Sequence, residues 1–154
     1  PALSVQKDYP AARVGTAARV RMQRNDIKTK FQSSKEDFAL LYFYSPGCEY
    51  CQVQEGIVHA FTDKYIWTVR GIDVNEDPEL AARFSVTTVP LILLIHRDNP
   101  SPLPVAAGVV ALDELTDRIY SGMRLLAGET EPEQFSIYKH EEGGSFDPKA
   151  ILEK

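Results

Sequence analysis

The two cysteines of the chain, Cys48 and Cys51, lie three residues apart and are the residues best placed to do chemistry. Thiols at positions i and i+3 of a helical turn are close enough to form a disulfide. The loop that such a bond closes is too short to add much stability in the chain-entropy model. The pair is therefore predicted to be a reagent in thiol–disulfide exchange rather than a structural cross-link.

Two other interpretations of the cysteine pair stay open. A zinc site would need about two further ligands, but the remaining soft donors, His59, His96 and His140, show no paired ligand spacing. A pair of unreactive buried thiols is the second alternative. We expect no metal because a paired ligand spacing is missing, and no cofactor because the sequence contains no phosphate-binding loop or glycine-rich dinucleotide turn.

The residues around the cysteines predict a strand that leads into a helix. Residues 38–44 (FALLYFY) form a nearly continuous apolar run, typical of a central strand covered on both faces. Turn residues follow, and apolar positions at helical spacing predict a helix over 48–64. Both cysteines are thus expected on the first helical turn, where unpaired N–H groups and the helix dipole would stabilise a nucleophilic Cys48 thiolate. Cys51, expected to be more buried, would resolve the mixed disulfide.

The rest of the chain predicts an α/β fold with the element order β-α-β-α-β-β-α. Asp77 and Pro78 are typical of a helix cap and a first helical residue. Apolar patterning predicts further strands over 67–74, 91–95 and 104–110, with residues 98–102 as a turn, and a last helix over 111–127.

The length of 154 residues and the hydrophobic content of 44% fit one globular domain that can bury a core. We expect an N-terminal helical extension over 1–35 that ends in a polar loop at 33–36. The α/β domain is expected over 36–128, and an acidic, extended tail over 129–154.

The charge of the chain is unevenly distributed. Residues 1–37 hold eight Lys or Arg against four Asp or Glu, and the remainder holds nine against eighteen, for a net charge of -5. This balance disfavours nucleic acid as a partner. No apolar run approaches the ~20 residues of a membrane span, and no signal peptide is visible.

Two motifs give the chain a family resemblance. Residues 43–51 (FYSPGCEYC) between a strand and a helix, and residues 84–90 (FSVTTVP) before another strand, resemble the thioredoxin superfamily over residues 36–127. The resemblance implies a thioredoxin-like fold, with a central mixed sheet of four to five strands flanked by helices. It also implies a cis bond between Val89 and Pro90, opposite the active-site disulfide. The backbone of Val89 would then pair with an extended substrate.

Several further residues are expected to contact substrate. Thr88 precedes the cis-proline pair, and Tyr44 and Tyr50 would border the cysteines together with Pro46 as an apolar docking surface. Ordinary core or boundary packing is the alternative role for these aromatic residues.

The sequence departs from thioredoxin next to the cysteines. The negative charge of Glu49 should oppose thiolate formation, which favours a reducing couple and a reductase or isomerase over a strong oxidase. The alternative is a helix-start acid that points into water. Tyr42 stands where thioredoxin carries a buried acid, and Gly71 aligns with its lysine neighbour, so a carboxylate proton relay is in doubt; Glu55 or water could substitute.

A narrower resemblance concerns the basic segment 19–24 (RVRMQR) before the domain. It is similar to F-type conjugal-transfer, pilus-assembly proteins of the TraF/TrbB group. That resemblance implies a periplasmic location, where protein disulfides persist. The implied partners are protein thiols and disulfides, an upstream redox partner, and secretion or pilus-assembly proteins.

Two alternative functions remain. The chain could be an assembly or binding module of a conjugal-transfer system in which the cysteines are incidental. It could also be a glutathione-dependent enzyme like the glutaredoxins, which the Cys-x-Tyr-Cys motif at 48–51 and the segment 88–90 (TVP) resemble, although residues 105–109 lack the Gly-Gly pair of that family.

Overall fold

The computed structural model describes residue 21 and residues 24–128. These residues belong to two compact units, and the boundary between the units in the sequence falls between Ser33 and Ser34. The first unit is helical from residue 24, and the helix continues through Ser34, so the prediction of a loop at 33–36 was wrong for its first two residues. The Ser33 hydroxyl donates to the Lys30 carbonyl at 3.1 Å, a local side-chain bond to the backbone near the end of the helix. The predicted acidic tail lies outside the described residues.

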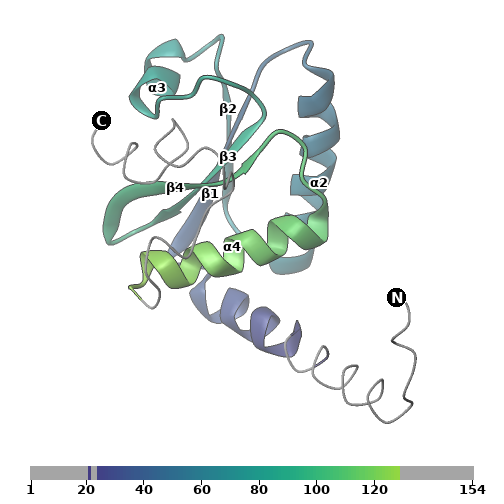
Figure 1. Cartoon of the computed structure of the whole chain (residues 1–154), viewed down its shortest axis with the longest axis vertical. Helices are drawn as coiled ribbons and strands as arrows, with labels where there is room; N and C mark the ends of the chain where they lie inside the picture. Colours follow the sequence, from purple (N-terminus) through teal and green to yellow (C-terminus); the bar gives the residue numbers. More distant parts are fainter. Residues whose placement is uncertain (1–20, 22–23, 129–154) are drawn as a thin grey trace, which may run out of the picture. The chain divides into compact units, whose positions relative to one another are not determined.

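The second unit contains a mixed four-stranded sheet (Figure 1). Its strands have the order β2-β1-β3-β4, in which β1 pairs parallel with β2 and antiparallel with β3, and β3 pairs antiparallel with β4. The α/β fold and the element order are therefore confirmed. The elements are β1 (Phe38–Tyr44), α2 (Glu49–Tyr65), β2 (Val69–Asp73), α3 (Pro78–Arg83), β3 (Leu91–His96), β4 (Asn99–Ala107) and α4 (Leu112–Leu126).

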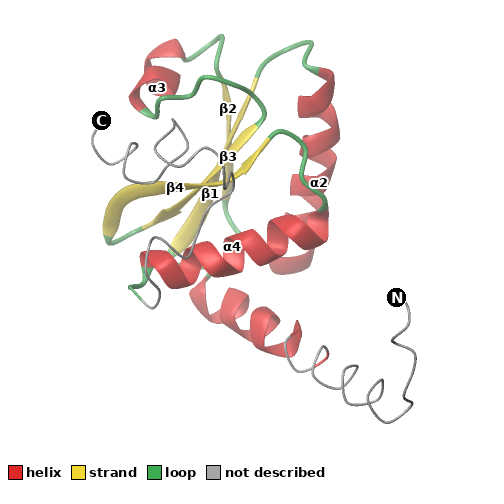
Figure 2. Ribbon diagram, viewed as in Figure 1, coloured by secondary structure: helices red, strands yellow, loops and turns green. Residues whose placement is uncertain are grey.

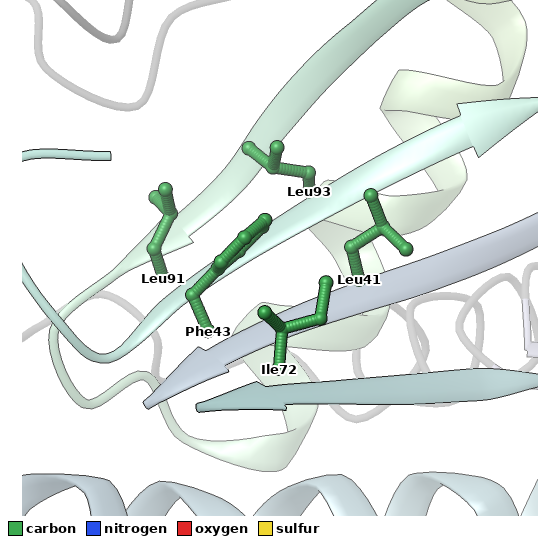
Figure 3. Close-up of a cluster of buried hydrophobic side chains, with 5 residues drawn as sticks. All are labelled: Leu41, Phe43, Ile72, Leu91 and Leu93. Atoms are coloured by element: carbon green, nitrogen blue, oxygen red, sulfur yellow. The ribbon is translucent and has the colours of Figure 1, made fainter. Parts of the chain in front are cut away.

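The alternation of side chains along the strands gives the sheet two covered faces. On one face a buried cluster holds Leu41, Phe43, Ile72, Leu91 and Leu93 (Figure 3). Leu80 and Phe84, from α3 and its C-cap, pack against it.

The opposite face carries the alternate positions of the same strands. α2 lies there, since the side chain of Tyr42 reaches the backbone of Cys51. α4 lies there as well, because a Cβ built on Gly122 would meet Leu94 and Leu103 at 3.0 Å. Figure 2 shows α2, α3 and α4 around the central strands. A strand buried on both faces explains the unbroken apolar run at residues 38–44.

Two strand boundaries differ from the sequence prediction. β2 begins at Val69, while Trp67 is buried before it, stacked on Phe38 and edge-on to Phe61. β4 begins at Asn99 and not at Pro104, so the predicted turn at 98–102 is largely strand. β4 is at the end of the strand order, and an edge strand tolerates prolines because the N–H groups that they lack would face away from the sheet.

The start of α3 follows the sequence prediction. The carboxylate of Asp77 accepts the Leu80 N–H at 3.2 Å, and Pro78 is the first helical residue. Within the described part of the chain, no helix combines the length and apolar character that a membrane span requires.

Candidate active site at the start of α2

The cysteines lie where β1 leads into α2. Gly47 has a positive φ of 77° in the connecting turn, a conformation that favours glycine. Cys48 is the N-cap of α2 in an extended conformation, so the helix starts one residue later than predicted and only Cys51 lies in its first turn. The two residues form a disulfide with their Cα atoms 5.1 Å apart.

The two sulfurs have different surroundings, as predicted. Cys48 is half-buried, whereas Cys51 is 3% exposed. The Cys51 N–H donates to Cys48 Sγ at 3.1 Å. This bond and the positive end of a helix dipole would both stabilise negative charge on Cys48 in the reduced protein. Glu49 is exposed in the first turn of the same helix.

A hydrogen bond from Tyr42 links the start of α2 to β1. The Tyr42 hydroxyl is buried and donates to the Cys51 carbonyl at 2.6 Å. Burial, the charge of Glu55 and then Tyr44 raise the pKa of Tyr42 to about 12. Tyr42 is thus a neutral donor that positions Cys51 rather than a base. The sequence analysis missed this role, although a tyrosine in a strand buried on both faces signals a hydroxyl that needs a partner.

The Val89–Pro90 bond is cis in the structure. Pro90 is buried, Val89 is half-buried and Thr88 is exposed. β3 starts at the next residue, Leu91, which pairs with Phe43 near the end of β1. The turn to Cys48 leaves β1 at that same end. The pairing of β1 with β3 therefore brings the two predicted motifs to the same end of the sheet.

The two tyrosines predicted to border the cysteines lie in different surroundings. Tyr50 is 71% exposed, and Val53, one turn further along α2, is 54% exposed. Tyr44 is half-buried and stacks on Tyr42, with ring centroids 5.6 Å apart. A Cβ on Gly71 would meet the Tyr44 ring at 3.5 Å, so Tyr44 faces β2.

A metal site would need donors that converge. Among residue 21 and residues 24–128, no three side chains of His, Cys, Asp or Glu come together as metal ligands do. Within these residues Cys48 and Cys51 have each other as partner.

Replacing Tyr42 with phenylalanine should change the alkaline stability of the protein. An unfolded tyrosine loses its proton near pH 10, but Tyr42 holds its proton to about pH 12 when folded. Deprotonation therefore lowers the free energy of the unfolded state relative to the folded state between pH 10 and 12, and wild-type stability falls over that interval. Tyr42→Phe should lose about 1 kcal/mol at pH 7 from the missing hydrogen bond and show a shallower decline from pH 10.

Urea unfolding at several pH values measures both effects. Tyr50→Phe, at an exposed position, is the matched control. Its free energy of unfolding should decline with pH above 10 as steeply as that of the wild type. A Tyr42→Phe slope equal to that of the wild type would contradict the assignment.

Three comparisons relate the chain to known proteins. The model of a family described as "TraF: F plasmid transfer operon protein" matches residues 1–120. Thioredoxin H2 of Arabidopsis thaliana is 32% identical over 84 residues, which are 53% of this chain and 59% of that protein. The match thus spans only about three-fifths of the length of this curated relative.

Two solved structures have a similar fold. Chloroplastic thioredoxin z matches with a TM-score of 0.51 and 18% identity, covering 61% of this chain and 84% of that chain. A malarial protein matches with a TM-score of 0.50 and 24% identity, covering 55% of this chain and 96% of that chain. These similarities confirm the thioredoxin-like fold. Since the family match covers most of the chain, including both cysteines and the cis-proline segment, the chain belongs to the TraF family of F plasmid transfer operon proteins.

Proposed function

We propose that the chain catalyses thiol–disulfide exchange on protein substrates, as a reductase or isomerase, during assembly of a conjugation apparatus. The observation that carries this proposal is the Cys48–Cys51 disulfide at the start of α2. The more accessible sulfur caps the helix and the buried sulfur lies behind it, which is the arrangement of a nucleophile and a resolving thiol.

The exchange needs only these two sulfurs. In the reduced protein the Cys48 thiolate attacks a substrate disulfide, forms a mixed disulfide, and releases one substrate thiolate, which takes a proton from water. Cys51 then loses its proton to water, and its thiolate attacks the Cys48 sulfur. This step closes the Cys48–Cys51 disulfide and releases the second substrate thiolate. Two electrons pass to the substrate, and an upstream dithiol reductant restores the pair.

The substrate would be held at the end of the sheet where β1 ends and β3 begins. Exposed Thr88 and half-buried Val89 precede β3 and offer backbone groups to an extended chain, with Pro90 fixing the turn. Tyr50 and Val53 add exposed apolar surface on the first turns of α2. Both features favour an unfolded or extended protein segment as substrate over a small thiol such as glutathione.

The reduction potential of the cysteine pair tests the proposed direction. Glu49 lies in the first turn, next to the nucleophile, and its charge opposes the Cys48 thiolate. We expect a potential at or below about -180 mV, whereas strong oxidants of this type lie near -120 mV. Glu49→Gln should raise it by roughly 10–20 mV, from the loss of a charge at a helix N-terminus.

Equilibration with glutathione buffers, followed by thiol trapping, measures the potential. Glu79→Gln, an exposed first-turn acid of α3, is the matched control and should leave it unchanged. A wild-type value near -120 mV would contradict the reducing role.

Family membership supports the biological setting that we propose. The TraF match favours the periplasm, an upstream reductant, and pilus-assembly or secretion proteins as partners. Complementation of a conjugation defect separates an enzyme from a binding module. If the Cys48→Ser protein restores conjugation in full, the chain acts in assembly by binding alone.

Reduction of insulin by dithiothreitol tests the activity itself. Added wild-type protein should accelerate precipitation of the insulin B chain. A rate equal to that in buffer would contradict the proposed function.

A further inference from the structure

A pocket of about 360 Å³ lies beside the middle and C-terminal half of α2. This volume is at the lower end of the range for small-ligand pockets, ~300–1,000 Å³. β1, α2, β2 and Trp67 supply its walls, and the lining residues include Tyr42, Tyr44, Glu55, His59, Thr62 and Gly71. The pocket adjoins β2, whereas Val89 precedes β3 on the other side of β1. It is therefore separate from the substrate site proposed above.

The strand that borders the pocket is at the edge of the sheet. Within residues 24–128, β2 pairs only with β1. The Leu40 N–H donates to the Thr68 carbonyl at 3.0 Å, so Thr68 faces β1. Because successive residues of a strand direct their N–H and C=O groups to alternate sides, those of Val69 and Gly71 point to the open edge. Such an edge is a template for an added strand.

Two hydroxyls of the pocket already donate their hydrogens elsewhere, and a carboxylate beside them can only accept. The hydroxyl of Tyr42 already donates to the Cys51 carbonyl, and that of Thr62 donates to the His59 carbonyl at 2.9 Å. Only their oxygen lone pairs remain. The carboxylate of Glu55, with its side chain 54% exposed, is an acceptor and carries negative charge. His59 Nε2 lies 3.6 Å from this carboxylate.

This set of groups selects a donor-rich cation. An arginine side chain has five N–H donors and no acceptor, matches a carboxylate with two parallel bonds, and stacks on aromatic rings. The stacked rings of Tyr42 and Tyr44 line the pocket together with Trp67. A lysine would find the same charge but would lose the stacking and the paired bonds.

Gly71 explains how an added strand would reach the pocket. It pairs with Tyr42 across the sheet and lines the pocket, and it carries no side chain that could fill it. A residue of an added strand beside Gly71 that faces α2 would direct its side chain into this space.

We propose that the edge of β2 binds an extended segment of a partner protein by strand addition, with an arginine of that segment in the pocket beside Glu55. This recognition needs no exchange at the cysteines. It would give the protein a second site, which holds a partner while Val89 and Cys48 act on a substrate disulfide.

Binding of a designed peptide tests the proposal. The probe is acetyl-TVTRTVT-amide, titrated into the oxidised ¹⁵N-labelled protein. Amide shifts should cluster at Val69 and Gly71, with side-chain contacts to Tyr44. A peptide with citrulline, a neutral isostere, in place of arginine should bind at least about fivefold more weakly, because it lacks the charge that pairs with the carboxylate.

Two variants locate the bound arginine. Glu55→Gln should reduce affinity for the arginine peptide and leave the citrulline peptide unaffected, while Gly71→Val should weaken both by filling the space. Glu79→Gln removes an acidic side chain of α3 instead. It is the matched control and should change neither affinity.

Three results would overturn the proposal. These are equal affinity for both peptides, shifts confined to residues 88–90, and no binding at millimolar peptide. The Cys48→Ser protein should bind the arginine peptide as the wild type does. Peptide binding therefore tests this site alone, and the insulin assay tests the proposed enzyme activity alone. A failure of one leaves the other result unchanged.

Discussion

Replacing Cys48 with serine will reduce the insulin-reduction rate to the background set by dithiothreitol, a loss of at least ~100-fold in the catalysed rate. Cys48 is the more accessible sulfur of the disulfide and caps α2. A serine hydroxyl keeps a cap but cannot form the mixed disulfide. The buried thiol of Cys51, 3% exposed, cannot replace it as the attacking group.

Two further variants make this prediction sharper. Cys51→Ser should still attack substrate through Cys48 but lack the resolving thiol, so a mixed disulfide with substrate should accumulate and be visible by non-reducing electrophoresis. Adding Ser121→Cys to Cys48→Ser restores the number of thiols at an exposed position of α4 and should restore no activity. Activity in the Cys48→Ser protein equal to that of the wild type would refute the nucleophile assignment.

Replacing Phe43 with alanine will remove about 3–5 kcal/mol of the free energy of unfolding. Phe43 is fully buried among Leu41, Ile72, Leu91 and Leu93, as Figure 3 shows. The substitution deletes a ring at the centre of the cluster that joins β1, β2 and β3. A loss of this size is a large part of the roughly 5–15 kcal/mol that stabilises a typical domain.

Urea unfolding of the oxidised protein measures the Phe43→Ala effect. Val53→Ala, at a position 54% exposed on α2, is the control and should change the free energy by less than about 0.5 kcal/mol. A Phe43→Ala loss below about 1 kcal/mol would mean that the cluster is not the core of the fold.

Much of the candidate site was predictable because its signals are local. The apolar run before Cys48, the glycine turn and the helical spacing after Cys51 are each set by residues that are neighbours in sequence. Pairing the cysteines needed only their spacing of three. The Asp77–Pro78 helix start was predictable for the same reason, since capping depends on a few adjacent residues.

Element boundaries were less predictable where tertiary packing competes with local preference. The segment 98–102, with Pro100 and Pro102, was predicted to be a turn, but β4 begins at Asn99 and includes both prolines, which an edge strand tolerates. Trp67 reads as part of a strand, but its side chain packs against the rings of Phe38 and Phe61 before β2 starts.

The sequence by itself determined the candidate redox pair of this protein, because the two thiols and the helix that begins beside them are encoded within a few consecutive residues. Only the tertiary structure decided what surrounds that pair. The bond from Tyr42 to Cys51 and the pocket of Glu55 and Gly71 join residues of three elements. Such contacts depend on how β1, β2 and α2 pack, and no local pattern in the chain fixes that packing.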